Sequence, residues 1–467
     1  MDNKIDKIFK RMYAVGSAIG TVNGNNTHSG NISMRDPDDD DLFYISSSGS
    51  QTGALVPTDL TPLRFSHVVW GDGRASTESV IHRKILALPG INAAMHCHFL
   101  YMTFISFDSK EKQMFLRYLG DDEKGREEFS LMPVDLFGVY AVGAVNVGSY
   151  FQPVGSTEME ERVPKYLQDH FVTIVRGHGP FVKGTSVEDA LYRVSTFESS
   201  AKLAFTLRRR GVNTVGLQNI LAADGLDSVF PVKPHLNNLE INSICEVTDQ
   251  TIIDDFRERM TYNYNRQLSA YGTGSMSQKV SSNQMIYSPM SACPEGMDFP
   301  LLRINLDEGE SDTPDLKLHK LIYNNTHLNT CMITTNPLAT AEGMAVLADK
   351  YSEKVLLGKD VDISYSLNDH PVIKPIDAEA IYLNPRVGLV DISQLSNYSA
   401  TNPILDMLRW HKGCCVVAGY GVVSAGDKTL EQCAHNASSA ERIAQFRQET
   451  DINSALLGGP SVKSYEP

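Results

Sequence analysis

The chain has 467 residues, of which 42% are hydrophobic and 21% are charged, and this is the composition of an ordinary globular protein. The length exceeds what one hydrophobic core usually supports, so two domains are expected. The formal net charge of −14 argues against a nucleic-acid partner, because surfaces that bind phosphate backbones are normally basic.

The cysteines and the lengths of the apolar stretches predict where in the cell the protein is located. Seven cysteines without paired spacing indicate free thiols in a reducing environment. The start, MDNKIDKIFKRM, lacks the apolar run of a signal peptide, and no stretch reaches the length of a membrane span. We therefore expect a cytoplasmic protein with no membrane partner.

The elements of the first half follow from periodicity. Residues 3–19 have helical spacing and end at a Gly/Asn-rich break. Two strand signals then flank the acidic run DDDD, which we expect to be a solvated hairpin tip. STESVIHRKILAL predicts an amphipathic helix, whereas INAAMHCHFLYM, GAVNVGSYF and TIVRGHGPFVKG predict strands. The charge-rich residues 107–130 predict either a lid or a solvated helix.

The second half repeats this order of elements. SDTPDLKLHKLIYNNTHLNTCMITT aligns with RASTESVIHRKILALPGINAAMHCH, and WHKGCCVVAGYGVVSAGDKTLEQC parallels DHFVTIVRGHGPFVKGTSVEDA. Such a repeat predicts the same fold twice. We expect a first domain at residues 1–221, a linker at 222–247 and a second domain at 248–467.

Three histidines of the first copy suggest a metal site. His96 and His98, two apart on a predicted strand, would point to the same face. His178 lies between two glycines, which would let the backbone turn closely around an ion. Three nitrogen ligands leave one coordination position open, as in a catalytic site. With 13 histidines in the chain, the pair alone is weak evidence.

The repeat supplies an internal control for these histidines. In the second copy, Ile333 stands at the position of His96, Thr335 at that of His98, and Tyr420 at that of His178. Glu78 aligns with Asp315. Histidines that served only packing would have no reason to disappear together, which favours the metal interpretation.

Glu78 follows Ser76 and Thr77 at the start of a predicted helix. A carboxylate is stabilised in any first helical turn by free N–H groups. Alternatively, the helix start and the two hydroxyls hold a phosphate while Glu78 acts as general acid and base.

The ordered motifs GNISMR, ISSSG, STE-x3-H, MHCH and GHG, across residues 10–210, resemble the class II aldolase/adducin family (L-fuculose-phosphate aldolase-like). The resemblance implies an α/β fold in α/β/α layers with a central, mostly antiparallel sheet, present twice. It implies Zn²⁺, or another divalent transition metal, on three histidines. The implied metal ligands are His96, His98 and His178; the catalytic residue is Glu78; the phosphate-binding residues are Asn31, Ser48, Gly49, Ser76 and Thr77.

Two features depart from the family pattern. His28 stands where a small hydroxyl residue is usual beside the phosphate; it would be either buried or phosphate-facing. The implied proton donor is a tyrosine from a neighbouring subunit, for which Tyr140 and Tyr150 are candidates; Tyr140 is our assignment.

The implied activity is a metal-dependent aldolase that cleaves a ketose phosphate to dihydroxyacetone phosphate and an aldehyde. A pentulose-phosphate 4-epimerase, a methylthiopentulose-phosphate dehydratase and a metal-free adducin-like interaction protein are the alternatives. The resemblance also implies a homo-oligomer, here a dimer of two-domain chains. The second copy would either supply a wall of the site, with residues 458–467 closing over it, or only complete the oligomer.

Overall fold

The computed structural model describes residues 3–67, 75–230, 232–233, 247–307, 313–359 and 362–457. Packing divides the chain into two compact units. The first comprises Met1–Pro133, Ala141–Ala201 and Pro294–Met297, and the second comprises Val134–Tyr140, Lys202–Cys293 and Asp298–Pro467. Residues 134–140 and 202–221, which the sequence placed in the first domain, thus cluster with the second unit. Most of the expected linker and the tail at 458–467 lie outside the described residues.

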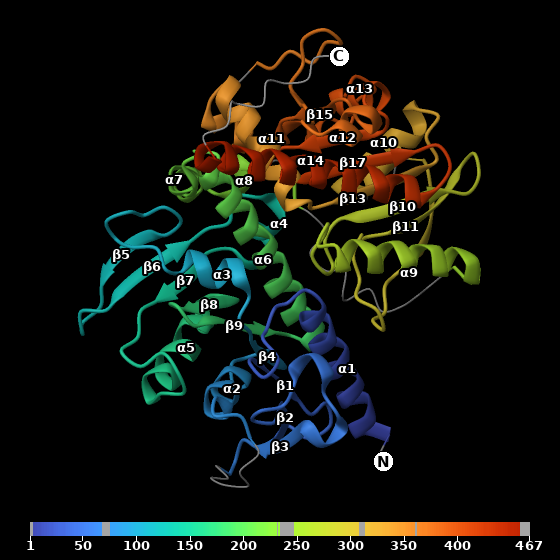
Figure 1. Ribbon diagram of the computed structural model, residues 1–467. Coiled ribbons are helices and arrows are strands. Elements are labelled where there is room, and N and C mark those ends of the chain that lie inside the picture. The colour runs from blue at the N-terminus through green and yellow to red at the C-terminus, as the bar shows by residue number, and fades with distance from the viewer. Residues whose placement is uncertain are drawn as a thin grey trace. The chain divides into compact units, whose positions relative to one another are not determined.

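The first unit contains one nine-stranded sheet of order β3-β2-β1-β4-β9-β8-β7-β6-β5 (Figure 1). Neighbouring strands run antiparallel except for the parallel pair β7–β8. Its strands are β1 (Asn31–Arg35), β2 (Leu42–Ser46), β3 (Leu60–Arg64), β4 (Ala93–His96), β5 (Arg117–Asp121), β6 (Glu127–Leu131), β7 (Val145–Gly148), β8 (Val172–Val175) and β9 (Gly179–Gly184). The acidic run is the tip of the β1–β2 hairpin, as predicted.

Helices pack against this sheet, and those at residues 3–21 and 79–86 lie where the sequence predicts them. Residues 100–105 form a helix where the predicted strand was expected to extend to residue 102, and the helix at residues 157–169 was not predicted. The helices are α1 (Asn3–Thr21), α2 (Ser79–Leu86), α3 (Leu100–Ile105), α5 (Thr157–Asp169) and α6 (Val187–Arg209). Ile81 and Ile85, one turn apart on α2, are fully buried with Met159 of α5 in one apolar cluster. Ser186 accepts a hydrogen bond from the backbone N–H of Asp189 and thereby caps the start of α6.

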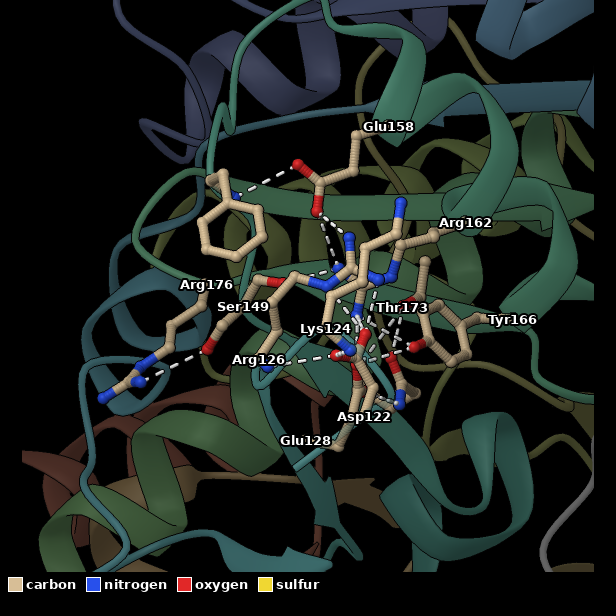
Figure 2. A network of polar contacts seen from close by, with 12 residues as sticks. Asp122, Lys124, Arg126, Glu128, Ser149, Glu158, Arg162, Tyr166, Thr173 and Arg176 are labelled. Atoms are coloured by element: carbon tan, nitrogen blue, oxygen red, sulfur yellow. Dashed lines mark hydrogen bonds and ion pairs between the residues drawn. The ribbon is translucent and has the colours of Figure 1, made fainter. Parts of the chain in front are cut away.

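Residues 107–130 form neither a lid nor a helix: the segment ends in the hairpin β5–β6. Ion pairs hold this hairpin to α5 (Figure 2). Arg126 pairs with Asp122 at 2.5 Å and also with Glu158 of α5. Arg162 of α5 pairs with Glu158 at 3.1 Å and with Glu128 of β6. These charged side chains are largely shielded from solvent, so the ion pairs between them hold the hairpin against the helix.

The second unit contains an eight-stranded sheet of order β12-β11-β10-β13-β17-β16-β15-β14. Its strands are β10 (Ser275–Lys279), β11 (Gln284–Ser288), β12 (Leu302–Asn305), β13 (Thr330–Thr334), β14 (Val372–Ile373), β15 (Val387–Val390), β16 (Cys414–Val417) and β17 (Gly421–Gly426). The order equals that of the first sheet without β5. Registers agree as well, since Asn31 pairs with His96 in one sheet and Ser275 with Ile333 in the other. The twice-present α/β fold is therefore confirmed.

The second unit includes most of helix α4 (Leu136–Val142), of which the residues up to Tyr140 cluster with it. Its other helices come later in the chain. The later ones are α7 (Thr214–Asp224), α8 (Leu226–Val229), α9 (Gln250–Asn265), α10 (Pro314–Asn325), α11 (Pro337–Lys350), α12 (Ala378–Leu383), α13 (Pro403–Trp410) and α14 (Leu430–Leu457). Among the described helices of the chain, none has both the length and the hydropathy needed to cross a membrane. The six cysteines in the described ranges are buried and form no disulfide.

Candidate metal centre

The structure brings the three predicted histidines together in the first unit. One ring nitrogen from each of His96, His98 and His178 lies within 4.8 Å of the others. The Nε2 atoms of His96 and His178 are 3.3 Å apart. All three ring centroids are separated by less than 5 Å, so the imidazoles converge on one point.

The backbone brings two of these histidines to the site in a way that the sequence did not predict. Strand β4 ends at His96, and His98 lies beyond it, where its N–H donates to Asn25 Oδ1 (2.8 Å) and Gly24 O (3.0 Å). His178 lies in the turn between β8 and β9 and not on a strand. The expected strand alternation is therefore wrong here, because local hydrogen bonds to the loop before β1 bend the chain after His96.

The two glycines beside His178 have the predicted steric role. Gly177 has φ +73°, a left-handed conformation that few other residues adopt without strain. A Cβ on Gly179 would lie 2.4 Å from the carbonyl oxygen of Cys97. Only glycine at position 179 therefore lets the His178 turn approach the Cys97–His98 segment this closely.

His96 is oriented by a hydrogen bond on its far side. Its Nδ1 lies 2.9 Å from the carbonyl oxygen of Pro180, which only accepts, so Nδ1 carries the hydrogen and the Nε2 lone pair faces the cluster. A second partner of this kind is typical of metal-ligating histidines. The ring also stacks on Phe181 with centroids 4.2 Å apart.

The donor set fits a divalent cation. Burial lowers the pKa of His96 to about 3, and burial together with the adjacent His96 lowers the pKa of His178 to about 4. Both rings are thus neutral at neutral pH, which is the form that binds metal. A proton shared by the Nε2 atoms of His96 and His178 would give a hydrogen-bond partner to those two rings only. A cation would accept a lone pair from all three rings.

Glu78 lies beside the histidines, at the residue before α2. Its Oε2 is 3.8 Å from His96 Nε2, and the residue is only 5% exposed. Asn31 Nδ2 donates to Glu78 Oε2 (2.8 Å) and to Ser76 Oγ (3.0 Å). Because Asn31 is the β1 partner of His96, the sheet register itself brings its amide to the Glu78 carboxylate beside His96.

The predicted phosphate-binding loops are joined by a β-bridge between Ser47 and Ala75. This bridge aligns the loop of Ser48 and Gly49 with that of Ser76 and Thr77. His28, which precedes β1, has its Nδ1 3.0 Å from Gly49 O and so lies against the loop of Ser48 and Gly49; its side chain is exposed and not buried.

Asn31 and Ser76 differ in whether their side chains still have a hydrogen to donate to a bound anion. Both amide hydrogens of Asn31 are used by Ser76 and Glu78, so as placed it has no hydrogen for an anion. Ser76 Oγ accepts from Asn31 and from the Glu78 N–H, and its own hydrogen remains to donate. Asn31 therefore orients the carboxylate, a role that the sequence did not reveal; Asn25 and Pro180, which orient two of the histidines, were also missed.

The two candidate tyrosines lie in different units. Tyr140 belongs to the second unit, where its hydroxyl donates to Asp227 Oδ1 at 3.2 Å; burial first, and then Asp227, raises its pKa to about 12. Tyr150 belongs to the first unit, and the Arg162 guanidinium lies 4.3 Å from its ring centroid. Its buried hydroxyl has no hydrogen-bond partner among the described residues. A catalytic role for either tyrosine stays a prediction.

The corresponding position in the second unit is closed by hydrogen bonds. Tyr420 donates to Asp315 Oδ1 at 2.7 Å, and Ser275 donates to Asp315 Oδ2 at 3.2 Å. Ser275 Oγ also lies 2.9 Å from His319 Nε2. Hydroxyl groups thus take the places of His178, the predicted metal ligand, and of Asn31, and they satisfy the buried carboxylate without a cation.

Known proteins resemble the first unit. The sequence model of the Class II Aldolase and Adducin N-terminal domain matches residues 10–205. A 3-oxo-tetronate 4-phosphate decarboxylase of Haemophilus influenzae is 26% identical over 202 residues, which are 43% of this chain and 82% of that relative. An L-fuculose phosphate aldolase of Methanocaldococcus jannaschii is 27% identical over 198 residues, which are 42% of this chain and 89% of that relative.

Among solved structures, the L-fuculose-1-phosphate aldolase of Thermus thermophilus has 25% sequence identity and a TM-score of 0.37, covering 44% of this chain and 95% of that one. The sequence model spans the segment that contains the three histidines and Glu78. By this match, residues 10–205 form a domain of the class II aldolase and adducin family.

Proposed function

We propose that this protein is a metal-dependent lyase that cleaves a ketose phosphate by a retro-aldol reaction, yielding dihydroxyacetone phosphate and an aldehyde. The observation that carries the proposal is the placement of a buried carboxylate, Glu78, 3.8 Å from the nearest of three convergent imidazoles. Named relatives that act on sugar phosphates, including an L-fuculose phosphate aldolase, support the substrate class.

His96, His98 and His178 would hold the metal. Three neutral imidazoles suit Zn²⁺ and also Fe²⁺, Co²⁺ or Mn²⁺, and zinc is our first choice because three protein ligands and one open position are its common catalytic arrangement. When bound, the ion supplies a Lewis acid for the negative charge that develops on substrate oxygens during carbon–carbon cleavage.

Glu78 would move the proton at the carbon released by cleavage. Cleavage turns the hydroxyl beside the broken bond into the aldehyde carbonyl, which releases the hydroxyl proton, and leaves the electron pair on the carbon atom of the dihydroxyacetone phosphate fragment. The Glu78 carboxylate would take up the released proton and deliver it to that carbon, so that no proton is gained or lost overall. In the reverse direction the carboxylate would remove the same proton. The hydrogen bond from Asn31 Nδ2 to Oε2 fixes which oxygen faces the strand and holds the other free to act.

The substrate phosphate would lie against the loops of Ser48, Gly49, Ser76 and Thr77. The Ser76 hydroxyl retains its hydrogen for an anion, and the residues that follow lead into the first turn of α2, where free N–H groups attract negative charge. This local site accepts an anion despite the overall charge of −14, since net charge does not determine the potential of one pocket.

Two observations favour a lyase over an epimerase and over a metal-free scaffold. The epimerases of this family commonly have Asp where Glu78 stands, which the resemblance implies and which favours cleavage over epimerisation. A metal-free scaffold is compatible with the second unit, where Tyr420 replaces a ligand, but it leaves the three convergent imidazoles of the first unit without a purpose.

The test begins with the metal content of the purified protein. About one divalent ion per chain is expected, with loss of that ion in a His96→Ala/His98→Ala variant. Thr335→Ala, which changes the counterpart of His98 in the second copy, is the matched control and should retain the ion. A wild type that binds no zinc, cobalt, iron or manganese would exclude the proposal.

A substrate panel then decides the reaction. Ketose 1-phosphates, including L-fuculose 1-phosphate, are assayed for release of dihydroxyacetone phosphate through a coupled reductase. A 3-oxo-tetronate 4-phosphate is assayed for carbon dioxide, and a methylthiopentulose phosphate for dehydration. Release of dihydroxyacetone phosphate supports the proposal; turnover of only one of the other two substrates would replace it with that activity.

A further inference from the structure

A buried histidine, His82, lies one turn after Glu78 in α2 and takes no part in the proposed chemistry. Its side chain is fully buried. Its Nδ1 lies 2.7 Å from the hydroxyl oxygen of Ser33 on β1. Its Nε2 is buried as well, but this nitrogen has no hydrogen-bond partner among the described residues. A buried polar atom without a partner is costly, so this nitrogen calls for an explanation.

Asn31 carries a second unpaired polar atom. Its Oδ1 is buried without a partner in the described part of the chain, whereas its Nδ2 donates to Glu78 and to Ser76. Asn31 and Ser33 are two residues apart on β1, so their side chains point to the same face of the sheet. An unpaired oxygen and an unpaired ring nitrogen therefore lie on one face of the same strand.

The second copy shows which side chain faces this ring nitrogen. His319 stands at the position of His82 and is also fully buried, and its Nε2 lies 2.9 Å from Ser275 Oγ. The sheet register puts Ser275 at the position of Asn31. The nitrogen that is unpaired in the first copy is therefore bonded, in the second copy, to the side chain at the Asn31 position.

The hydrogen bonds of the second copy have a defined direction. The Asp315 carboxylate only accepts, so the single hydroxyl hydrogen of Ser275 goes to Asp315 Oδ2. Burial lowers the pKa of His319 to about 3, so its ring is neutral. Ser275 Oγ then accepts from His319 Nε2–H, and His319 Nδ1 accepts from the Ser277 hydroxyl at 2.6 Å. Donation thus runs from Ser277 through the histidine and Ser275 to the carboxylate.

The contacts of the first copy fit the same direction. Ser33 Oγ lies 2.7 Å from His82 Nδ1 and 3.4 Å from Ala94 O, and its one hydrogen belongs to the shorter contact. Nδ1 of His82 is then an acceptor. Because burial lowers the pKa of His82 to about 3, the neutral ring carries its hydrogen on Nε2. Asn31 Oδ1 is the acceptor that this hydrogen requires.

We propose that His82 is a positioning residue for Glu78: its Nε2–H donates to Asn31 Oδ1, directly or through one water molecule, and so holds the amide that orients the carboxylate. Donation then runs from Ser33 through His82 and Asn31 to Glu78. With its oxygen held in this way, the Asn31 amide presents Nδ2 and not Oδ1 to the carboxylate. The catalytic consequence rests on the proposed function, whereas the hydrogen bond itself does not.

This role accounts for a feature of the repeat. The three convergent histidines are all replaced in the second copy, but the position of His82 remains a histidine, His319. A metal ligand has no use in the second copy. A ring that passes a hydrogen bond towards a buried carboxylate is useful in both copies, because Asp315 remains where Glu78 stands.

The position of the hydrogen is tested without an activity measurement, by nuclear magnetic resonance on protein isotope-labelled at its histidine ring nitrogens. The His82 signals are identified by their absence from His82→Gln. We expect the hydrogen on Nε2, with a downfield and slowly exchanging proton signal that moves upfield in Asn31→Ala. A hydrogen on Nδ1, or an Nε2–H signal that Asn31→Ala leaves unmoved, would overturn the proposal.

The positioning role is tested by two replacements of His82. His82→Gln keeps an N–H donor near the place of Nε2 and should retain most of the wild-type kcat. His82→Leu removes the donor at similar volume and should lower kcat roughly 3- to 10-fold, the effect of one neutral hydrogen bond, with KM and metal content unchanged. His319→Leu, which removes the equivalent donor of the second copy, is the matched control and should leave kcat unchanged.

A double-variant cycle shows whether His82 acts through Asn31. If it does, His82→Leu added to Asn31→Ala lowers kcat no further than Asn31→Ala alone, because the residue that transmits the effect is already missing. Additive losses, equal losses in His82→Leu and His82→Gln, or a loss of kcat in His319→Leu would overturn the positioning role. Urea unfolding of each variant verifies that it is folded. If the wild type turns over no substrate, the proposed function fails, while the ring-nitrogen signals still decide whether the hydrogen bond exists.

Discussion

Replacement of Asn31 by alanine tests whether the geometry around Glu78 serves the reaction. Asn31 Nδ2 donates to Glu78 Oε2 at 2.8 Å and to Ser76 Oγ at 3.0 Å, and among the described residues no other side chain donates a hydrogen bond to the Glu78 carboxylate. The variant keeps the three histidines and the carboxylate. It removes the donor that fixes the position of the carboxylate beside His96, together with the hydrogen bond to Ser76.

The size of the effect follows from the kind of hydrogen bond that is lost. A bond to a charged group contributes about 1.5–3 kcal/mol, and a carboxylate that loses its orientation gives up that energy in the transition state. We therefore expect kcat to fall roughly 10- to 150-fold. The metal content should stay near that of the wild type, because the Asn31 amide hydrogens go to Glu78 and Ser76 and the His96 ring is held by Pro180.

The assay is steady-state release of dihydroxyacetone phosphate, with the bound ion measured on the same sample. Ser275→Ala is the matched control: it removes the donor to Asp315 at the equivalent register position of the second unit and should leave kcat unchanged. Retention of full kcat by Asn31→Ala, or an equal loss in Ser275→Ala, would show that the reasoning about Glu78 is wrong.

Three further predictions concern the packing of the two sites. Gly179→Ala, whose Cβ would lie 2.4 Å from Cys97 O, should destabilise the protein by about 1–3 kcal/mol and lower its zinc affinity; unchanged zinc titrations would contradict this. Tyr420→Phe removes the 2.7 Å bond to Asp315 and should cost about 1–3 kcal/mol in urea unfolding, with metal content unchanged as the control. Burial lowers the pKa of His319 to about 3, so below its ordinary pKa of 6.5 the unfolded chain binds a proton that the folded protein excludes. Stability should fall as the pH drops from 6.5 towards 3, by up to about 5 kcal/mol. His319→Gln should flatten this fall in unfolding experiments between pH 7 and pH 5, and an unaltered slope would refute the assignment.

Much of the site was predictable because its signals are local. The spacing of Ile81 and Ile85 on α2 follows from the helical period, and the joint loss of three histidines in the second copy identifies them without any knowledge of the fold. The place of His98 was not predictable in the same way. Its N–H leaves the strand for Asn25 and Gly24, and no pattern in residues 91–100 encodes that distant partner.

The hairpin β5–β6 escaped prediction for a different physical reason. Strand β5 alternates between exposed and half-buried residues, so it lacks the apolar alternation that marks a strand. What holds the hairpin is the ion-pair network of Arg126 and Arg162 with acidic residues of the hairpin and α5 (Figure 2). Charges that look solvated in the sequence are paired in the structure, and only the fold brings the pairs together.

The closed site of the second unit shows how the same fold is kept without the three histidines. A buried carboxylate, Asp315, remains where Glu78 stands in the first unit, and an unpaired buried carboxylate is costly. Removal of the ligands alone would therefore destabilise the unit. Instead, tyrosine replaces His178 and serine replaces Asn31, and both hydroxyls donate to Asp315. The ring that supplies one of these donors is covered by Phe137. The tyrosine that stands at the position of His178 thus supplies both a hydrogen-bond donor to Asp315 and an apolar ring on which α4 rests.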